Sequence, residues 1–563
     1  MKKNSAHTRL IELQKKIHRT LEREAQAIFG PAVPAIRAYE RACSRDFQGR
    51  HQISTKSELI RAIRDTDVTL LADHHAFAQS QRTALRLLRE AVLPGEHWAL
   101  GLEFIPSQFQ SELDLYQSGK MDLETFLQTI RYREDWGFPW RNYAPLLEWA
   151  RQHSVKVLAL NRPKPLLPIG RSIRDLHARD QWAAGIISDY FHENKNPLRV
   201  FVLYGGYHVG QQHLPRHLSR ISKAFLGKPL RALSVHQNVD QLYWKLAQSE
   251  RELQAQVLRF KKNIFCVFSG TPWSQLQSMI ECADGHLLNN SGLAHESSDD
   301  DDDSSVPNDS LTLMSKYGEL IADFLELPRP SFDSLTVHGV DEADFTDTLG
   351  DALSAHQLRM IHSWIESNQR FYLPRVQVAY IATPSSNAIA ELAAQHLYFQ
   401  RTRIDDFFSG GSESFYQWIL LQSFGHLGSL VVNPRRKCDL PMDHQKRLRV
   451  LKKKPKKIHF QEQVSREWAL ELLRMRKLRL EIPKSASLKA TAPLLGARYS
   501  AQILASRLYH LLMDLKQGDP RFQNLVNRLV ARSNFEEHYH SLVRITTESA
   551  ALQRPLLSKL EQL

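Results

Sequence analysis

Histidine and carboxylate side chains follow or end several short apolar runs in the first half of this sequence. Asp73 and His75 follow one run, Glu103 lies near the end of a second, and His208 follows a third. Imidazole nitrogens can ligate a metal or haem iron and can transfer protons. Carboxylates can ligate hard cations or act as general acids and bases. These residue types therefore offer metal or haem binding, or acid/base catalysis.

Three more polar side chains lie near the ends of the same kind of run. Asn161 ends a fourth run, and Tyr204 and Tyr207 precede His208. An asparagine side chain both donates and accepts hydrogen bonds, so Asn161 could orient a substrate or a water molecule. Tyrosine and histidine can both serve as axial ligands of haem iron. His75, His208, Tyr204 and Tyr207 are therefore alternative axial ligands.

Each of these residues also has a structural interpretation. Asp73 could be the N-cap of the helix that follows it. Glu103 is harder to explain in this way, because an acid in a strand that is buried on both faces is costly without a partner or a function. The joint occurrence of polar side chains at four successive strand ends indicates a site more strongly than any single residue.

The elements that must position these side chains alternate between strands and helices. The apolar runs predict strands over residues 68–72, 98–104, 155–160, 200–204, 233–236 and 264–268. Amphipathic stretches predict helices over 80–91, 123–130, 144–153 and 180–192. This alternation predicts an α/β fold with a mostly parallel sheet flanked by helices. Because ligands of open α/β sheets bind outside the carboxyl ends of the strands, we expect Asp73, His75, Glu103 and His208 to share one crevice.

The length of 563 residues predicts several domains, because single cores stop growing near ~250–300 residues. We expect an N-terminal helical segment over 1–50 and the α/β domain over 51–290. An acidic linker over 291–310 contains the run Asp299–Asp303, which cannot bury apolar surface. A mainly helical domain is expected over 311–563, with one strand-like run over 376–382.

Cysteine usage and hydropathy favour a cytoplasmic protein. The four cysteines contain no CxxC pair, so a disulfide framework or zinc ribbon is not expected, and a reducing compartment fits best. No run of 18 apolar residues predicts a membrane span. The first residues lead into an amphipathic helix rather than the apolar stretch of a secretion signal.

The net charge of +13 is concentrated in one stretch of the second half. Arg435–Lys457 holds 11 Lys and Arg residues against 2 Asp residues. Such clustering suits an anionic partner such as nucleic acid. A solvated basic loop is the alternative interpretation, because the stretch lacks aromatic side chains on which bases could stack.

Five blocks in the first domain resemble the ChaN-like haem-binding family, which is grouped with the Tiki, TraB and erythromycin-esterase proteins. The blocks are Leu70–His75, Leu102–Gly119, Trp136–Arg151, Ala159–Asn161 and Gly205–Leu218. In the first block Ala72 and Asp73 stand where the family usually has Gly and Glu. The resemblance implies an α/β fold with a ligand site built from these blocks.

The wider group contains haem-binding proteins and hydrolases, and the fold alone does not choose between them. The first interpretation is a ligand-binding protein that holds haem, iron or another metal. Its cofactor-binding residues would be His75, Glu103, Asn161, Tyr204, Tyr207 and His208, of which His75, Glu103 and His208 would ligate a divalent metal.

Two further interpretations stay open. A hydrolase would use Asp73, His75, Glu103 and His208, either to bind a metal that activates water or as general acid/base groups. An intracellular scaffold would bind anionic partners through its helical half. Haem in addition requires aromatic walls, and the candidates are Phe77, Phe104, Phe109, Trp136, Phe138, Trp140, Tyr143, Tyr204 and Tyr207.

Overall fold

The structure is a computed structural model of the chain. It describes residues 6–31, 34–163, 173–194, 198–290, 309–339, 346, 349, 352–366, 370–381, 385–403, 412–436, 440–453, 460–473, 491–515 and 518–548. The chain divides into two compact units, one of residues 18–297 and one that combines residues 1–17 with 298–562. This division falls within helix α1 (Ala6–Phe29). The acidic run Asp299–Asp303 lies outside the described residues.

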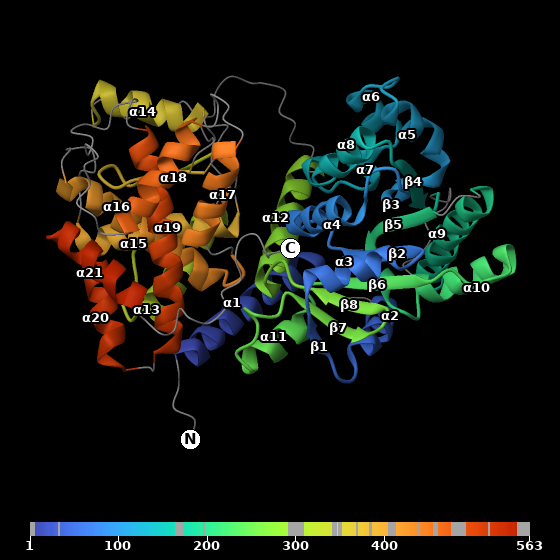
Figure 1. The fold of residues 1–563 in the computed structure, drawn as a ribbon, viewed down its shortest axis with the longest axis horizontal. Helices are drawn as coiled ribbons and strands as arrows, with labels where there is room; N and C mark the ends of the chain where they lie inside the picture. Colours follow the sequence, from blue (N-terminus) through green and yellow to red (C-terminus); the bar gives the residue numbers. More distant parts are fainter. Residues whose placement is uncertain are drawn as a thin grey trace. The chain divides into compact units, whose positions relative to one another are not determined.

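The first unit is built on an eight-stranded sheet with the order β1-β7-β8-β6-β2-β5-β3-β4 (Figure 1). The strands from β8 to β4 are parallel to their neighbours, whereas β7 runs antiparallel to both β8 and β1. The strands are β1 (Gln52–Ser54), β2 (Val68–Asp73), β3 (His97–Pro106), β4 (Lys156–Asn161), β5 (Leu198–Gly205), β6 (Ala232–Gln237), β7 (Val257–Lys261) and β8 (Ile264–Val267). The predicted mostly parallel α/β fold is confirmed.

Helices cover both faces of this sheet, as the apolar character of its central strands requires. One apolar layer packs strand side chains against α3, α4 and α8, and the other packs them against α9 and α10. The helices of this unit are α2 (Pro34–Ser44), α3 (Lys56–Arg64), α4 (Ala78–Ala91), α5 (Gln110–Gln117), α6 (Leu123–Thr129), α7 (Tyr132–Asp135), α8 (Ala144–Gln152), α9 (Ile173–Glu193), α10 (Leu214–Leu226), α11 (Asp240–Gln248) and α12 (Pro272–Asn290). Short 3₁₀ turns are η1 (Arg45–Phe47), η2 (Ser107–Phe109), η3 (Trp140–Asn142) and η4 (Gly206–Val209).

All six strands predicted for this unit are present in the structure, within two residues at each end. Two strands were not predicted, β1 and β7. β1 has only three residues, two of them exposed, and the end of β7 is exposed. Strands that are this short and partly exposed contain no apolar run from which they could be predicted.

The second unit is mainly helical, as predicted. Its helices after α1 are α13 (Asp309–Leu325), α14 (Ala355–Glu366), α15 (Ser386–Thr402), α16 (Ser412–Val432), α17 (Pro441–Lys453), α18 (Phe460–Leu473), α19 (Thr491–Asp514), α20 (Pro520–Leu529) and α21 (Phe535–Glu548). The strand-like run forms β11 (Val378–Tyr380), which pairs with β10 (Phe371–Leu373) and β9 (Thr336–His338).

Candidate functional site

Three adjacent strands bring their polar ends together at one edge of the sheet. Asp73 ends β2 and lies opposite Gly205, which ends β5. β3, which carries Glu103, pairs with the other side of β5. β5 thus lies between β2 and β3 in the sheet, although β2 and β3 follow each other along the chain. Such a change in strand order leaves a crevice at the carboxyl ends, where α/β proteins place ligands.

Gly205 marks the point where the expected site residues meet. A Cβ atom at position 205 would lie 3.1 Å from Oε2 of Glu103, 3.4 Å from Cδ2 of His208 and 3.5 Å from Nε2 of His75. Three side chains from β3, from η4 and from the loop after β2 therefore surround one glycine. The absence of a side chain at this position keeps the space between them open.

Asp73 orients His75. Its Oδ2 atom accepts hydrogen bonds from Nδ1 of His75 at 2.8 Å and from the hydroxyl of Tyr143 at 2.8 Å, and its Oδ1 atom accepts one from Nε2 of Gln81 at 2.5 Å. Asp73 is therefore not a helix N-cap, and the cap position of α4 is occupied by Phe77.

Charge around His75 decides its protonation. Burial lowers the pKa of the imidazole, but the hydrogen bond and the charge of Asp73, together with the charge of Glu103, outweigh burial and raise the pKa above its usual value. Since Nδ1 is bound to Asp73, Nε2 is the nitrogen available to a ligand. It lies 3.9 Å from Oε2 of Glu103.

Glu103 is buried, with 3% of its side chain exposed, and has the partners that burial of an acid requires. Its Oε1 atom pairs with Arg179 of α9, and its Oε2 atom accepts the backbone N–H of Gly205. Arg179 is partly buried: burial lowers the pKa of its guanidinium, and the charge of Glu103 more than compensates, so the pKa is raised. Glu103 thus connects β3 to β5 and α9.

His208 lies on η4, directly after β5, and is buried. Its Nδ1 atom lies 2.7 Å from Oδ1 of Asp180 and 3.0 Å from the hydroxyl of Tyr39. Its ring packs edge-on against Tyr204 at 5.1 Å between centroids. Tyr204 is fully buried, and burial followed by the charge of Glu103 raises the pKa of its hydroxyl.

Two expected residues lie apart from this cluster. The side chain of Tyr207 is 43% exposed. Asn161 ends β4, which is separated from β5 by β3, and lies opposite Pro106. Within the described part of the chain, no hydrogen bond links either side chain to Asp73, His75 or Glu103.

Aromatic side chains form a wall beside His75. The rings of Trp136 and Phe138 lie 4.4 and 5.1 Å from its ring, centroid to centroid, and both are only partly buried. Phe104 lies 4.8 Å from Tyr143. Phe77 does not join this wall, because it packs tightly against Gly270. The wall is thus apolar and partly open to solvent on the side of His75.

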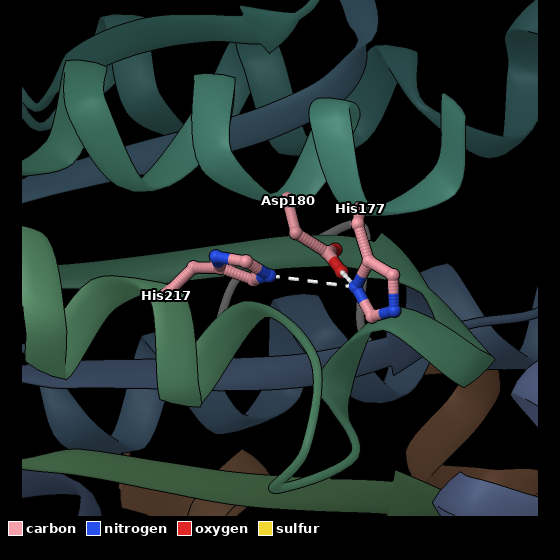
Figure 2. Close-up of side chains that lie close together, drawn as sticks. All are labelled: His177, Asp180 and His217. Carbon is pink, nitrogen blue, oxygen red and sulfur yellow. Dashed lines mark hydrogen bonds and ion pairs between the residues drawn. The ribbon is translucent and has the colours of Figure 1, made fainter. Parts of the chain in front are cut away.

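A second cluster was not predicted. His177 and Asp180 of α9 and His217 of α10 point toward one another (Figure 2). Among the described residues, no other group of three His, Cys, Asp or Glu side chains brings its ligand atoms within 4.8 Å of one another. The assignment of a metal to His75, Glu103 and His208 therefore stays a prediction. The spacings His177-x-x-Asp180 and His213-x-x-x-His217 were the available signal, because residues three or four apart share a helix face.

Asp180 is fully buried yet stays ionised. Burial raises the pKa of its carboxyl, but hydrogen bonds from His177 and His208, the charge of His208 and the hydrogen bond from Tyr39 lower the pKa to about 2. Burial lowers the pKa of the nearby His217. The cluster therefore combines a carboxylate with a neutral imidazole.

Cys43, His236 and Asp46 form a third group, whose residue types are those of a cysteine-nucleophile triad. Sγ of Cys43 lies 4.0 Å from Nδ1 of His236, and Nε2 of His236 lies 3.1 Å from Oδ2 of Asp46. However, Cys43 is only 5% exposed. Burial and the charge of Asp46 raise the pKa of its thiol to about 12. This group is therefore a packed core contact rather than a reactive thiol.

Part of the basic stretch Arg435–Lys457 is described. Arg436, which precedes α17, pairs with Glu391 at 2.5 Å, and two cations of α17 also have acidic partners. Arg447 pairs with Glu462 at 3.0 Å, and Lys452 pairs with Glu467 at 3.2 Å. These pairs reduce the positive charge that α17 offers to an anionic partner. In the described helices, none combines the length and the apolar character that crossing a membrane requires.

Comparison with known proteins adds one family. Residues 59–168 match the family model described as "Haem-binding uptake, Tiki superfamily, ChaN". None of the curated proteins matches the chain.

Two solved structures are similar to parts of the chain. The structure titled "Cofacial heme binding to ChaN of Campylobacter jejuni" is 13% identical, with 32% of this chain and 86% of that chain covered and a TM-score of 0.25. The C-terminal region of Pasteurella multocida toxin, described as having a thiol-protease-like catalytic triad, is 14% identical, with 35% and 26% covered and a TM-score of 0.21. At such TM-scores neither structure supports a conclusion about this chain.

The family match covers β2, β3 and β4 with the helices between them, and thus Asp73, His75, Glu103 and Asn161. Residues 59–168 of this chain are therefore ChaN-like: they resemble the family described as haem-binding uptake proteins of the Tiki superfamily.

Proposed function

We propose that the α/β unit binds haem at the carboxyl ends of β2, β5 and β3. The observation that carries this proposal is the position of His75: its ring lies beside an aromatic wall that is only partly buried, and its Nε2 atom faces the Gly205 gap. Haem binding needs both an axial ligand and apolar or aromatic surface for the porphyrin. The family match to haem-binding proteins supports the same choice.

The residues present fit this ligand. Asp73 holds the proton on Nδ1 of His75, so in the neutral ring the lone pair of Nε2 is directed toward the Gly205 gap, as ligation of a metal there requires. Trp136 and Phe138 would contact the porphyrin face or edge. His208 lies at the Gly205 gap and is held by Asp180. Tyr207, two residues after Gly205, is 43% exposed.

A divalent metal is the alternative ligand at this site. His75, Glu103 and His208 would then supply the nitrogen and oxygen atoms that borderline metals accept. The raised pKa of His75 weakens binding of a metal at low pH, because the metal and the proton compete for the same imidazole nitrogen.

A hydrolase is the second candidate function, and the pair of Asp73 and His75 favours it. A carboxylate that orients an imidazole is the usual arrangement of a general base. Asp73, His75, Glu103 and His208 would be its catalytic residues. Assays of ester and peptide substrates in the presence of Mn²⁺, Co²⁺ and Zn²⁺ test this candidate, and inactivity on all of them counts against it.

Haemin titration of the full chain tests the main proposal. We expect a saturable Soret band at micromolar protein, and a weaker band for His208→Ala or Tyr207→Ala if either side chain contributes to the haem environment. Absence of a saturable Soret change in the unsubstituted protein would reject haem binding.

An anionic partner at Arg435–Lys457 and a cytoplasmic location stay predictions. Binding of nucleic acid that weakens steeply with salt would support the first, because phosphate contacts release counterions. Nucleic-acid binding that does not change with salt concentration would reject the prediction of an anionic partner.

A further inference from the structure

Two neighbouring helices on one face of the sheet direct three potential metal ligands at one another. α9 presents His177 and, one turn later, Asp180, while α10 presents His217. Figure 2 shows the rings of His177 and His217 facing each other, with the carboxylate of Asp180 beside them. Nδ1 of His177 lies 3.4 Å from Nε2 of His217 and 3.7 Å from Oδ2 of Asp180.

These separations suit a shared ion better than a hydrogen bond. An N–H donor and its acceptor usually lie 2.7–3.2 Å apart, so 3.4 Å is long for a bond between two imidazoles. Two nitrogens each about 2.0–2.1 Å from one tetrahedral zinc ion lie about 3.3 Å apart. The observed imidazole spacing therefore matches that of two ligands of a single ion. The ligand atom of Asp180 lies within 4.8 Å of both nitrogens, so the carboxylate would move closer when an ion binds.

We propose that His177, Asp180 and His217 bind a divalent transition-metal ion of the zinc class. Two imidazoles and one carboxylate are a borderline donor set, which favours Zn²⁺, Co²⁺ or Fe²⁺ over the hard ions Mg²⁺ and Ca²⁺. Three protein ligands also leave a coordination position for water or a small molecule.

The surroundings are consistent with entry and retention of an ion. The side chain of His177 is 36% exposed, so an ion can reach the cluster from solvent. Asp180 is fully buried, so its negative charge is screened little by water. His213 stacks on Tyr39 and donates through Nε2 to the backbone carbonyl of Tyr39 if that nitrogen carries the proton. Its Nδ1 atom is buried and has no described hydrogen-bond partner.

The metal site and the candidate haem site share one residue. Oδ1 of Asp180 accepts a hydrogen bond from Nδ1 of His208, while Oδ2 accepts one from the hydroxyl of Tyr39 and faces His177. Metal binding would therefore fix the carboxylate that positions His208 at the Gly205 gap. This inference goes beyond the proposed haem binding and does not depend on it.

Titration of the metal-free, untagged full chain with Co²⁺ and Zn²⁺ tests the proposal. Co²⁺ should produce visible absorption typical of four- or five-coordinate nitrogen and oxygen ligation, and Zn²⁺ should displace it. We expect His177→Ala and His217→Ala each to weaken Co²⁺ affinity at least tenfold. Both side chains are partly exposed, so far-UV circular dichroism should show that the variants remain folded.

Two controls separate this site from other histidines. His192→Ala changes an exposed histidine on the same helix and should leave Co²⁺ affinity unchanged. His75→Ala removes a ligand of the other candidate metal site and shows whether Co²⁺ binds there instead. Equal Co²⁺ affinity in the unsubstituted protein, His177→Ala and His217→Ala would overturn the proposal, and so would loss of affinity in His75→Ala alone.

Discussion

Nε2 of His75 lies 3.9 Å from Oε2 of Glu103, although their strands β2 and β3 are not neighbours in the sheet. β5 runs between them and ends at Gly205, over which the two side chains meet. Asp73 fixes His75 from one side, and Arg179 fixes Glu103 from the other. The relationship therefore depends on a glycine at the end of β5 and on two charged partners.

Substitution of this glycine should affect the ligand more than the fold. In Gly205→Ala the new methyl group would lie 3.1 Å from Glu103 and 3.5 Å from His75, in the space between them. We expect haemin affinity to fall about tenfold, which corresponds to about 1.4 kcal/mol. Gly185→Ala is the matched control, because a Cβ there has no neighbour within 4 Å. Equal affinity in both variants would show that the gap does not receive the ligand.

Glu103 should matter for local stability as well as for the site. Glu103→Gln leaves Arg179 without its counter-charge, and loss of a charged hydrogen-bond partner costs about 2 kcal/mol. We expect faster amide hydrogen exchange in peptides that contain β3 and β5. Glu148→Gln breaks an exposed pair with Arg151 and should have little effect on exchange. Unchanged protection of β3 and β5 in Glu103→Gln would contradict this structural role.

The aromatic wall should contribute to haem binding through contact area. Trp136→Ala removes the ring nearest His75, at 4.4 Å between centroids, and we expect haemin affinity to fall by about tenfold or more. Trp182→Ala is the control, because Trp182 is 42% exposed and lies on α9. A Soret titration compares the two variants, and an equal loss in both would mean that the wall near His75 has no specific role.

The helical unit should lose stability in acid through Glu391 of α15. Burial raises the pKa of this carboxyl, but the charges of Arg436 and Arg370 and the hydrogen bond and charge of His426 lower it well below 4.5; Arg498 also faces it. A depressed folded-state pKa contributes stability above the unfolded value of 4.5, and this contribution is lost as pH falls through the folded pKa.

Thermal unfolding of the native chain and Glu391→Gln at pH 7, 5, 4 and 3 checks this. At pH 7 we expect the variant to be about 3–5 kcal/mol less stable, because two partly buried arginines lose the charge of their buried partner. The difference should shrink below pH 4.5, because the carboxyl of the unfolded chain takes up a proton first, and that of the folded chain does so only at lower pH. A difference that is the same at every pH would contradict the assignment.

Periodicity and strand-end chemistry predicted much of the α/β unit and part of the site. The central strands are apolar enough to be recognised from residue order alone, and a parallel sheet brings their carboxyl ends to one edge. The partners that give the site its charge were not predictable in this way. Arg179 and Asp180 come from α9, and Tyr143 directly precedes α8. Their contacts depend on how helices pack on the sheet. The short strand β1 was missed for lack of an apolar run.

The contrast between two adjacent histidines tests the central claim most directly. His75 faces the Gly205 gap, whereas Nε2 of His74 lies 3.1 Å from the backbone carbonyl of Gln237 on β6. Haemin titration of His75→Ala and His74→Ala, with circular dichroism to confirm folding, compares the two. The account predicts a Soret band that is lost or strongly shifted in His75→Ala and retained in His74→Ala. Retention of the unsubstituted spectrum and affinity in His75→Ala would contradict it.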